Sequence, residues 1–363
     1  MAEMDRYFKL MVEHNTSDLH LCTGCRPMFR KDGSIVPLKT AEPLTNDQVS
    51  SLLFEVMPEK NKEEFRKTND TDFAYELAGV GRYRMNIFRD NKGIGGVARL
   101  IPSEVLTLDQ LKAPEVLKKF CQLSKGLVLV TGPTGSGKST TLAAMLDHIN
   151  KTRNDHVITI EDPIEFVHRN QRCLINQREV GVHTDSFKRA LRAALREDPD
   201  IVLVGEMRDL ETTHIAIETA ETGHLVFGTL HTTTAISTVD RLIDQFPPEQ
   251  QQQIRLMLAN TLKGVVAQNL LKKKGGGRVA ALEILFVNAA VASLIREAKS
   301  AQIMSIMQTS KKEGMTLLNE ELRRLVKEDI VEPEEAYRKA VDKDGLLKLL
   351  QSDNIKFQAP QED

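Results

Sequence analysis

One segment near the middle of the chain constrains the fold more than any other. A short apolar run at residues 127–130 is followed by the pattern G-x-x-x-x-G-K-S, and helix-forming residues come next, at 141–146. Glycines at this spacing let the backbone curl, so that successive N–H groups point inward at the start of a helix, where the helix dipole favours anions. The pattern therefore predicts a strand, a phosphate-binding loop and a helix, in that order.

The residues of this loop are the expected contacts of a nucleoside triphosphate. Lys138 is expected to reach the β- and γ-phosphates, and the hydroxyl of Ser139 is expected to ligate Mg²⁺. ATP and Mg²⁺ are thus the expected cofactors of an ATP-hydrolysing enzyme. The full set is Gly132, Pro133, Thr134, Gly135, Ser136, Gly137, Lys138, Ser139 and Thr140.

Composition restricts the classes of protein that this chain can be. The formal net charge is −2, and aromatic residues make up 5% of the 363 residues. Because a nucleic-acid motor needs a basic and aromatic binding surface, no nucleic-acid partner is expected. No run approaches the ~20 apolar residues of a membrane span, and the first residues lack a signal-peptide pattern, so a cytoplasmic location is expected. Cys22 and Cys25 have no second pair at zinc spacing and are interpreted as reduced thiols.

Changes in pattern along the chain predict four regions. Residues 1–101 are expected to form a small α+β domain, and residues 102–113 a linker. Residues 114–290 alternate short apolar runs with helical patterns, which predicts an α/β domain with a mostly parallel sheet. Residues 291–363 predict helices with polar loops and a polar tail.

Several elements can be placed within these regions. In the first, helices are expected at 4–12 and 46–57, a strand at 17–22, a hairpin at 29–38 that turns at Asp32-Gly33, and a strand pair at 81–88 and 95–101. In the α/β region, strands are expected at 127–130, 157–160, 201–204 and 225–229, with a helix at 185–197. The basic run at 272–278 is interpreted as an exposed hairpin turn.

Carboxylates follow two of the expected α/β strands. Glu206 comes after the strand at 201–204 and is the candidate for activating the attacking water and for contacting Mg²⁺. Glu161 and Glu165 follow the strand at 157–160, where buried carboxylates would need a cation such as Mg²⁺. We expect both to participate in the site, with Glu161 as a metal ligand, while a structural role in the following turn stays open.

Histidines flank another expected strand, at 225–229. His231 follows it, at the position where a residue that senses the γ-phosphate is expected. His224 precedes the same strand, and functional and structural roles both stay open for it.

Two groups of arginines are candidates for stabilising charge in the transition state. Arg82 and Arg84 lie two residues apart on an expected strand and therefore face the same way. Arg189, Arg192 and Arg196 fall on one stripe of the helix expected at 185–197. Either group could reach a γ-phosphate across a domain or subunit boundary, and the alternative for each is a solvated charged face.

Four motifs together resemble those of the secretion and pilus ATPase superfamily, and within it the retraction motors of the type IV pilus. They are the loop at 132–139, the acidic box at 158–165, Gly-Glu-Met-Arg-Asp at 205–209 and the histidine box at 222–231. The resemblance implies a PAS-like N-terminal domain, a RecA-like P-loop ATPase domain and a homohexameric ring that binds ATP between domains. It also implies pilin depolymerisation and twitching motility, with the ring peripheral at the cytoplasmic side of the inner membrane, where it would meet the pilus platform protein and the pilin machinery.

The C-terminal region departs from the pattern of this family. Retraction motors typically carry A-I-R-N-L-I-R-E, whereas residues 290–297 read A-V-A-S-L-I-R-E. An accessory retraction ATPase, a paralogue that works beside a primary motor, therefore stays open as an alternative. A RecA-like nucleic-acid motor is a more distant one.

Overall fold

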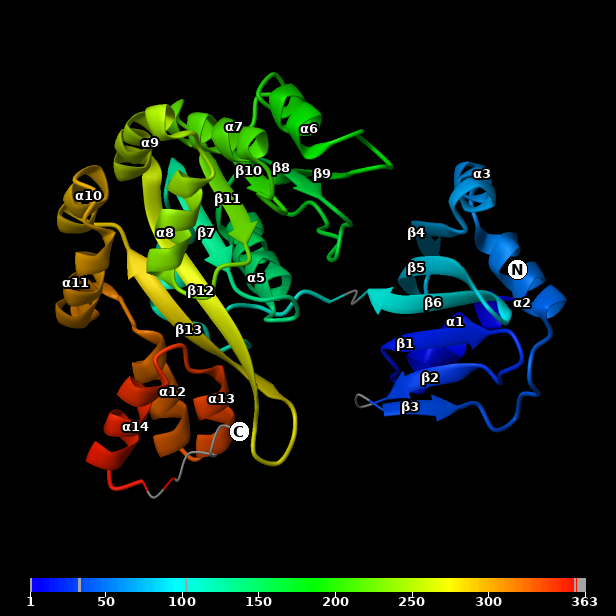
Figure 1. The fold of residues 1–363 in the computed structure, drawn as a ribbon. Helices are drawn as coiled ribbons and strands as arrows, with labels where there is room; N and C mark the ends of the chain where they lie inside the picture. The colour runs from blue at the N-terminus through cyan, green and yellow to red at the C-terminus, as the bar shows by residue number, and fades with distance from the viewer. Residues whose placement is uncertain (1, 32–33, 102–103, 356, 358–363) are drawn as a thin grey trace. The chain divides into compact units, whose positions relative to one another are not determined.

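The computed structural model describes residues 2–31, 34–101, 104–355 and 357, and it divides into two compact units, Met1–Glu104 and Val105–Asp363. Figure 1 shows each unit built around its own β-sheet. This division leaves the C-terminal helices in the same unit as the parallel sheet. The finer boundaries expected from the sequence, a linker and a separate C-terminal region, stay a prediction.

The first unit is an antiparallel sheet covered by helices, as the α+β pattern predicted. The strands lie in the order β3-β2-β1-β6-β5-β4. The elements are α1 (Asp5–Glu13), β1 (Asp18–Cys22), β2 (Met28–Lys31), β3 (Ser34–Pro37), α2 (Asn46–Val56), α3 (Glu59–Thr68), β4 (Asp70–Leu77), β5 (Gly81–Asp90) and β6 (Gly93–Ile101). The turn expected at Asp32-Gly33 lies outside the described residues, while the strands on either side of it are present.

Local sequence explains where these elements begin and which faces are buried. Helix α2 starts at a capping box, in which Thr45 and Gln48 each accept a hydrogen bond from the other's backbone N–H. On β5, Tyr83 and Met85 are fully buried in the core of the unit. Because side chains alternate along a strand, Arg82 and Arg84 lie on the opposite face, as expected.

The second unit contains a seven-stranded sheet in the order β13-β12-β7-β11-β10-β8-β9, parallel except for β13, which pairs antiparallel with β12. The strands are β7 (Gly126–Thr131), β8 (His156–Glu161), β9 (Leu174–Glu179), β10 (Ile201–Val204), β11 (Leu225–Leu230), β12 (Leu262–Lys272) and β13 (Arg278–Phe286). The helices are α4 (Glu115–Cys121), α5 (Lys138–Thr152), α6 (Phe187–Ala194), α7 (Leu210–Glu221), α8 (Ala235–Asp244), α9 (Pro248–Thr261), α10 (Ala289–Arg296), α11 (Ile303–Thr309), α12 (Leu318–Lys327), α13 (Pro333–Lys339) and α14 (Lys343–Ser352), with short 3₁₀ turns at Ser300–Gln302 and Lys311–Glu313.

Helices cover both faces of this sheet, so its central strands are buried on both sides. Along β7, Leu127 and Leu129 belong to one apolar cluster, which includes α7, α8 and α9. Val128 and Val130, which point the other way, belong to a second cluster with α4 and α5. The fold class is therefore the predicted α/β architecture with a P-loop, and the four strands expected from apolar runs are all present.

The C-terminal helices pack on the hairpin formed by β12 and β13. Leu271 of β12 and Ala281 of β13 are fully buried in a cluster with residues of α12, α13 and α14. Figure 1 shows this hairpin extending beyond the rest of the sheet toward these helices. The region is helical, as expected, and its core includes residues of the two strands that precede it.

The bounds of one expected helix need correction. The helix expected at 185–197 is shorter, Phe187–Ala194, because Ser186 caps its start and the chain turns at Leu195. As a result Arg196 lies after the helix and not on its stripe.

Candidate functional site

The loop between β7 and α5 has the backbone conformation that a phosphate cradle requires. Gly132 and Gly137 have φ values of 140° and 90°, which favour glycine over other residues. A Cβ atom on Gly132 would lie 2.2 Å from the carbonyl oxygen of Gln268. No side chain fits there, so this glycine is needed for the close approach of β12 as well as for the turn.

Gln268 of β12 fixes the loop through side-chain hydrogen bonds, a role that the sequence did not predict. Its side-chain Nε2 donates to the backbone carbonyl of Ser136 at 2.7 Å, and its Oε1 accepts from the hydroxyl of Thr141 at 2.7 Å. The side chain is 3% exposed. One amide thus joins the loop and the first turn of α5 to β12. No local motif marks Gln268, because it lies more than a hundred residues further along the chain.

Polar groups in the loop suit a phosphate ligand. Lys138 Nζ donates to the carbonyls of Gly132 at 2.8 Å and Pro133 at 3.3 Å. Burial lowers the pKa of Lys138, while the charges of Glu206 and Glu165 act in the opposite direction. The hydroxyl oxygen of Ser136 is buried and has no hydrogen-bond partner among the described residues. These groups fit an oxyanion that would supply the missing partner.

The remaining residues of the loop are accessible to a ligand. Pro133, Thr134 and Gly135 are exposed, and Ser139 and Thr140 are partly exposed in the first turn of α5. The N–H groups of this turn have no partner within the helix, so they are available to an anion.

Glu206 and His231 meet where two neighbouring strands end. Strands β10, β11 and β7 are neighbours in the sheet and run parallel. The residues that follow β10 and β11 therefore lie at the same edge of the sheet as the phosphate-binding loop, which follows β7. His231 Nε2 lies 2.7 Å from Glu206 Oε1, and Arg208 Nε lies 2.5 Å from the same oxygen. A cavity of about 330 Å³ opens beside them, lined also by Arg241 and Gln245. The predicted acid and the predicted sensor histidine are thus brought together.

The environment of Glu206 keeps its carboxylate ionised. Burial disfavours the charged form, but the hydrogen bonds and charges of Arg208 and His231 outweigh this effect and hold the pKa of Glu206 below its ordinary value. An ionised carboxylate beside the phosphate-binding loop can accept a proton from water or contact a cation.

Removing Arg208 should shift the acidic side of the pH–rate profile. A group with a lowered pKa remains an active base until the pH falls through that lowered value. In Arg208→Gln the pKa of Glu206 should rise, so kcat/KM should begin to fall at a higher pH than in the wild type. Measuring kcat/KM for ATP across the acidic range tests this. An unchanged acidic limb would mean that a different group limits the rate at low pH.

The acidic box at the end of β8 lies at the same edge of the sheet. Glu161 Oε1 accepts hydrogen bonds from Thr159 Oγ1 at 2.6 Å and from Gln177 Nε2 at 3.1 Å. Burial raises the pKa of Glu161, and the charge of Glu165 adds to the increase. Glu165 is exposed, so it is the more accessible of the two to a ligand.

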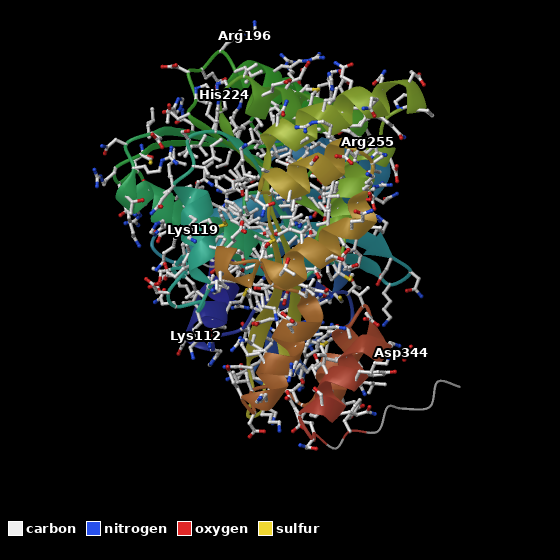
Figure 2. The ribbon with its side chains drawn as sticks, turned by 90° about the vertical axis from the view of Figure 1, so that its left-hand side faces the viewer. Lys112, Lys119, Arg196, His224, Arg255 and Asp344 are labelled. Carbon is white, nitrogen blue, oxygen red and sulfur yellow. The ribbon has the colours of Figure 1, made fainter. Side chains whose placement is uncertain are left out.

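His224, for which functional and structural roles were both open, lies outside this cluster. Its carbonyl accepts a hydrogen bond from Gly126, the first residue of β7, whereas the phosphate-binding loop follows the last residue of that strand. The length of β7 therefore separates the two sites within one chain, about 17 Å. The ring Nδ1 of His224 lies 3.1 Å from the carbonyl of Thr219. Figure 2 shows His224 near the same end of the unit as Arg196.

The candidate arginines differ in how their side chains are engaged. Arg189 pairs with Asp185, and Arg192 pairs with Glu211 at 3.0 Å. Arg84, in the first unit, lies 3.7 Å from Asp72. For Arg196 the described part of the chain contains no ion-pair or side-chain hydrogen-bond partner, and the side chain is exposed (Figure 2).

No preformed metal site is found in the residues that the structure describes, since no group of three or more His, Cys, Asp or Glu side chains could hold an ion. Cys22, Cys25, Cys121 and Cys173 are free thiols. Within the same described residues, no helix has both the length and the hydrophobicity to cross a membrane.

A glycine-rich loop joins a central parallel strand to a helix, and an ionised carboxylate lies at the end of a nearby strand. Together these features define a P-loop nucleotide-binding protein. Residues 3–276 match the model of a family described as Type II/IV secretion system protein, and the chain belongs to this family.

Several relatives that match nearly the whole chain are pilus ATPases. It is 52% identical to the "Type IV pilus retractation ATPase PilT" of Pseudomonas aeruginosa, over 91% of this chain and 95% of that protein. It is 38% identical to the "Type IV pilus ATPase PilU" of the same organism, over 92% of this chain and 87% of that protein. A crystal structure of the pilus retraction motor PilT with bound ADP superimposes with a TM-score of 0.90 at 45% identity, covering 96% of this chain and 99% of that one.

Proposed function

We propose that this protein is an ATP-hydrolysing motor of the type IV pilus that powers pilus retraction and twitching motility. The observation that carries the proposal is the pairing of Glu206 with His231 at the sheet edge from which the loop of Lys138 emerges. Such an arrangement would put a proton acceptor beside a phosphate cradle. The identity with a pilus retraction ATPase over nearly the whole of both chains supports the pilus as the system served.

The side chains divide the chemistry between binding and hydrolysis. The loop N–H groups, Lys138 and the Ser136 hydroxyl would bind the phosphates, and Glu206 would orient and deprotonate the attacking water. Mg²⁺, when bound, would be held by Ser139 with Glu206 or Glu161 nearby, and it would neutralise charge on the phosphates. His231, fixed against Glu206, would respond to the presence of the γ-phosphate.

We further propose that the active form is a homohexameric ring. It would lie at the cytoplasmic side of the inner membrane and contact the pilus platform protein and the pilin machinery. Support comes from the arginines of both units, some of which are exposed far from the loop in the sequence and could complete a neighbouring subunit's site.

An accessory role resembling that of PilU is the second candidate, and the segment at 290–297 is the observation that favours it. Ala292 and Ser293 occupy the positions where Arg and Asn are typical. Ser293 Oγ donates to Glu297 within α10 at 2.8 Å, so its side chain is engaged locally. The higher identity to PilT than to PilU supports the primary role. A nucleic-acid motor has little support, given the net charge of −2, and stimulation of ATP hydrolysis by DNA would revive it.

Deleting the gene in the organism that encodes the protein should abolish pilus retraction and leave extended pili on the cell surface. The wild-type gene should restore retraction, and a Lys138→Ala gene should not, because the loop would lose its phosphate-binding cation. Retraction is measured by imaging labelled pili. A deletion strain that retracts normally, although the purified protein hydrolyses ATP, would show that the pilus assignment is wrong. Partial loss of retraction would favour the accessory role.

A further inference from the structure

Glu283 is a buried carboxylate that the proposed chemistry does not use. It lies on β13 and is 7% exposed. Its Oε1 accepts a hydrogen bond from the backbone N–H of Ala235 at 2.7 Å, and its Oε2 accepts one from the backbone N–H of Leu318 at 3.2 Å. Ala235 is the first residue of α8 and Leu318 is the first residue of α12. One carboxylate therefore joins the starts of two helices that are far apart in the sequence.

The two helix starts stabilise the carboxylate of Glu283, but burying its charge costs free energy. Unpaired N–H groups and the helix dipole make each helix start attractive to an anion, and here two starts share one anion. Burial raises the pKa of Glu283, while the two N–H donors act in the opposite direction. Among the described residues no basic side chain pairs with this carboxylate. An apolar residue would avoid the cost of burying it but could not hold either helix start.

On one side, Glu283 is connected to the candidate site. Helix α8 begins three residues after Thr232, which itself follows His231. Thr232 Oγ1 lies 2.7 Å from Thr238 Oγ1 in the first turn of α8, and Thr238 Oγ1 lies 3.4 Å from Thr131 Oγ1, at the end of β7. The start of α8 is thus bonded both to the segment that follows His231 and to the strand that precedes the phosphate-binding loop.

On the other side, Glu283 is connected to the C-terminal helices. Next to it, Ile284 and Thr316 exchange two backbone hydrogen bonds, of 2.9 and 3.0 Å, immediately before α12 begins. Leu322 and Leu325 of α12 are fully buried with residues of α13 and α14. A displacement of the start of α12 would therefore also move α13 and α14, which pack against it.

We propose that Glu283 is a positioning residue that couples the nucleotide site to the C-terminal helices, by fixing the start of α8 relative to the start of α12. The inference rests on the proposed function, because it requires that nucleotide binds at the loop. A change in the His231 segment on nucleotide binding would be transmitted through the Ala235 and Leu318 hydrogen bonds. The C-terminal helices would then report nucleotide state to whatever they contact.

Backbone hydrogen exchange in the full-length protein, with and without ADP, tests the coupling. In the wild type, ADP should change exchange at the start of α8 and also in the first turn of α12. In Glu283→Gln, one acceptor oxygen is replaced by an NH₂ group, which donates but cannot accept, so one helix start loses its hydrogen bond. Exchange at that start should become about tenfold faster or more, and the response of α12 to ADP should disappear while the loop still binds ADP.

Matched variants separate this outcome from a general loss of stability. Glu313→Gln makes the same chemical change at an exposed carboxylate in the turn before α12, and it should leave the response of α12 intact. Glu283→Asp keeps the charge but is too short to reach both helices, so it should behave like Glu283→Gln. If ADP alters α8 but not α12 in the wild type, the inference is wrong whether or not the variants fold. If the wild type binds no nucleotide, the proposed function itself fails.

Discussion

Replacing Glu206 with glutamine should reduce ATP hydrolysis by about 10²–10⁴-fold while leaving nucleotide binding nearly unchanged. The amide retains the size of the carboxylate but cannot accept a proton from water. The groups that bind phosphate belong to the loop between β7 and α5 and are not altered. Initial rates of phosphate release and the equilibrium affinity for ADP, measured on the same preparation, test both parts.

The interpretation depends on two comparisons. Glu221→Gln makes the same change at an exposed position on α7 and should not alter the rate. Lys138→Ala should instead weaken nucleotide binding itself. Near wild-type turnover in Glu206→Gln would remove Glu206 from the chemistry and leave Glu161 and Glu165 as the remaining candidate acids.

Substituting Arg196 with alanine should lower kcat by about 10³–10⁵-fold if this side chain completes the site of a neighbouring subunit. Among the described residues it has no ion-pair partner, so its guanidinium can move to a developing charge without breaking a bond. Arg189 and Arg192 are held by Asp185 and Glu211. Their alanine variants should therefore change kcat far less.

The affinity for ADP should change little in Arg196→Ala, because a finger acts mainly in the transition state. Mixing this variant with Glu206→Gln provides the decisive measurement, since a mixed ring contains some sites with an intact acid and an intact arginine. Partial recovery of activity is expected only if the arginine acts in trans. An Arg196→Ala protein with normal kcat would exclude the residue and direct attention to Arg82 and Arg84.

The central part of the fold could be predicted because its signals are local. Strands β7, β8, β10 and β11 are buried on both faces, so each is a continuous apolar run. Strand β9 was missed because it is an edge strand, with a polar sequence and exposed positions such as Leu174. Helix α3 was missed for a similar reason, since Phe65 is its one buried residue.

The candidate site was predictable to the extent that it follows strand ends. Glu206 and His231 each lie within two residues of the end of a buried strand, and parallel strands bring such residues to one edge. The same reasoning does not extend to His224, because a residue before a strand lies at the opposite edge of the sheet. Gln268 and Glu283 could not be found from local pattern. Their roles depend on which backbone groups come close to β12 and β13 after folding, and no spacing in the sequence records that.

The hairpin of β12 and β13 has a mechanical consequence. β12 pairs with β7 as far as Ala267, and beyond that point it pairs with β13 alone. Gln268, which is hydrogen-bonded to the phosphate-binding loop, lies at the point where the hairpin leaves the sheet. The hairpin would therefore pivot at this residue. The free part of β12 is about 17 Å long, so a tilt of about 5° there would displace its tip, and the helices packed on it, by about 1.5 Å, the scale of helix shifts in known switches. An ångström-scale displacement at the nucleotide could thus move the C-terminal helices without any rearrangement of the sheet.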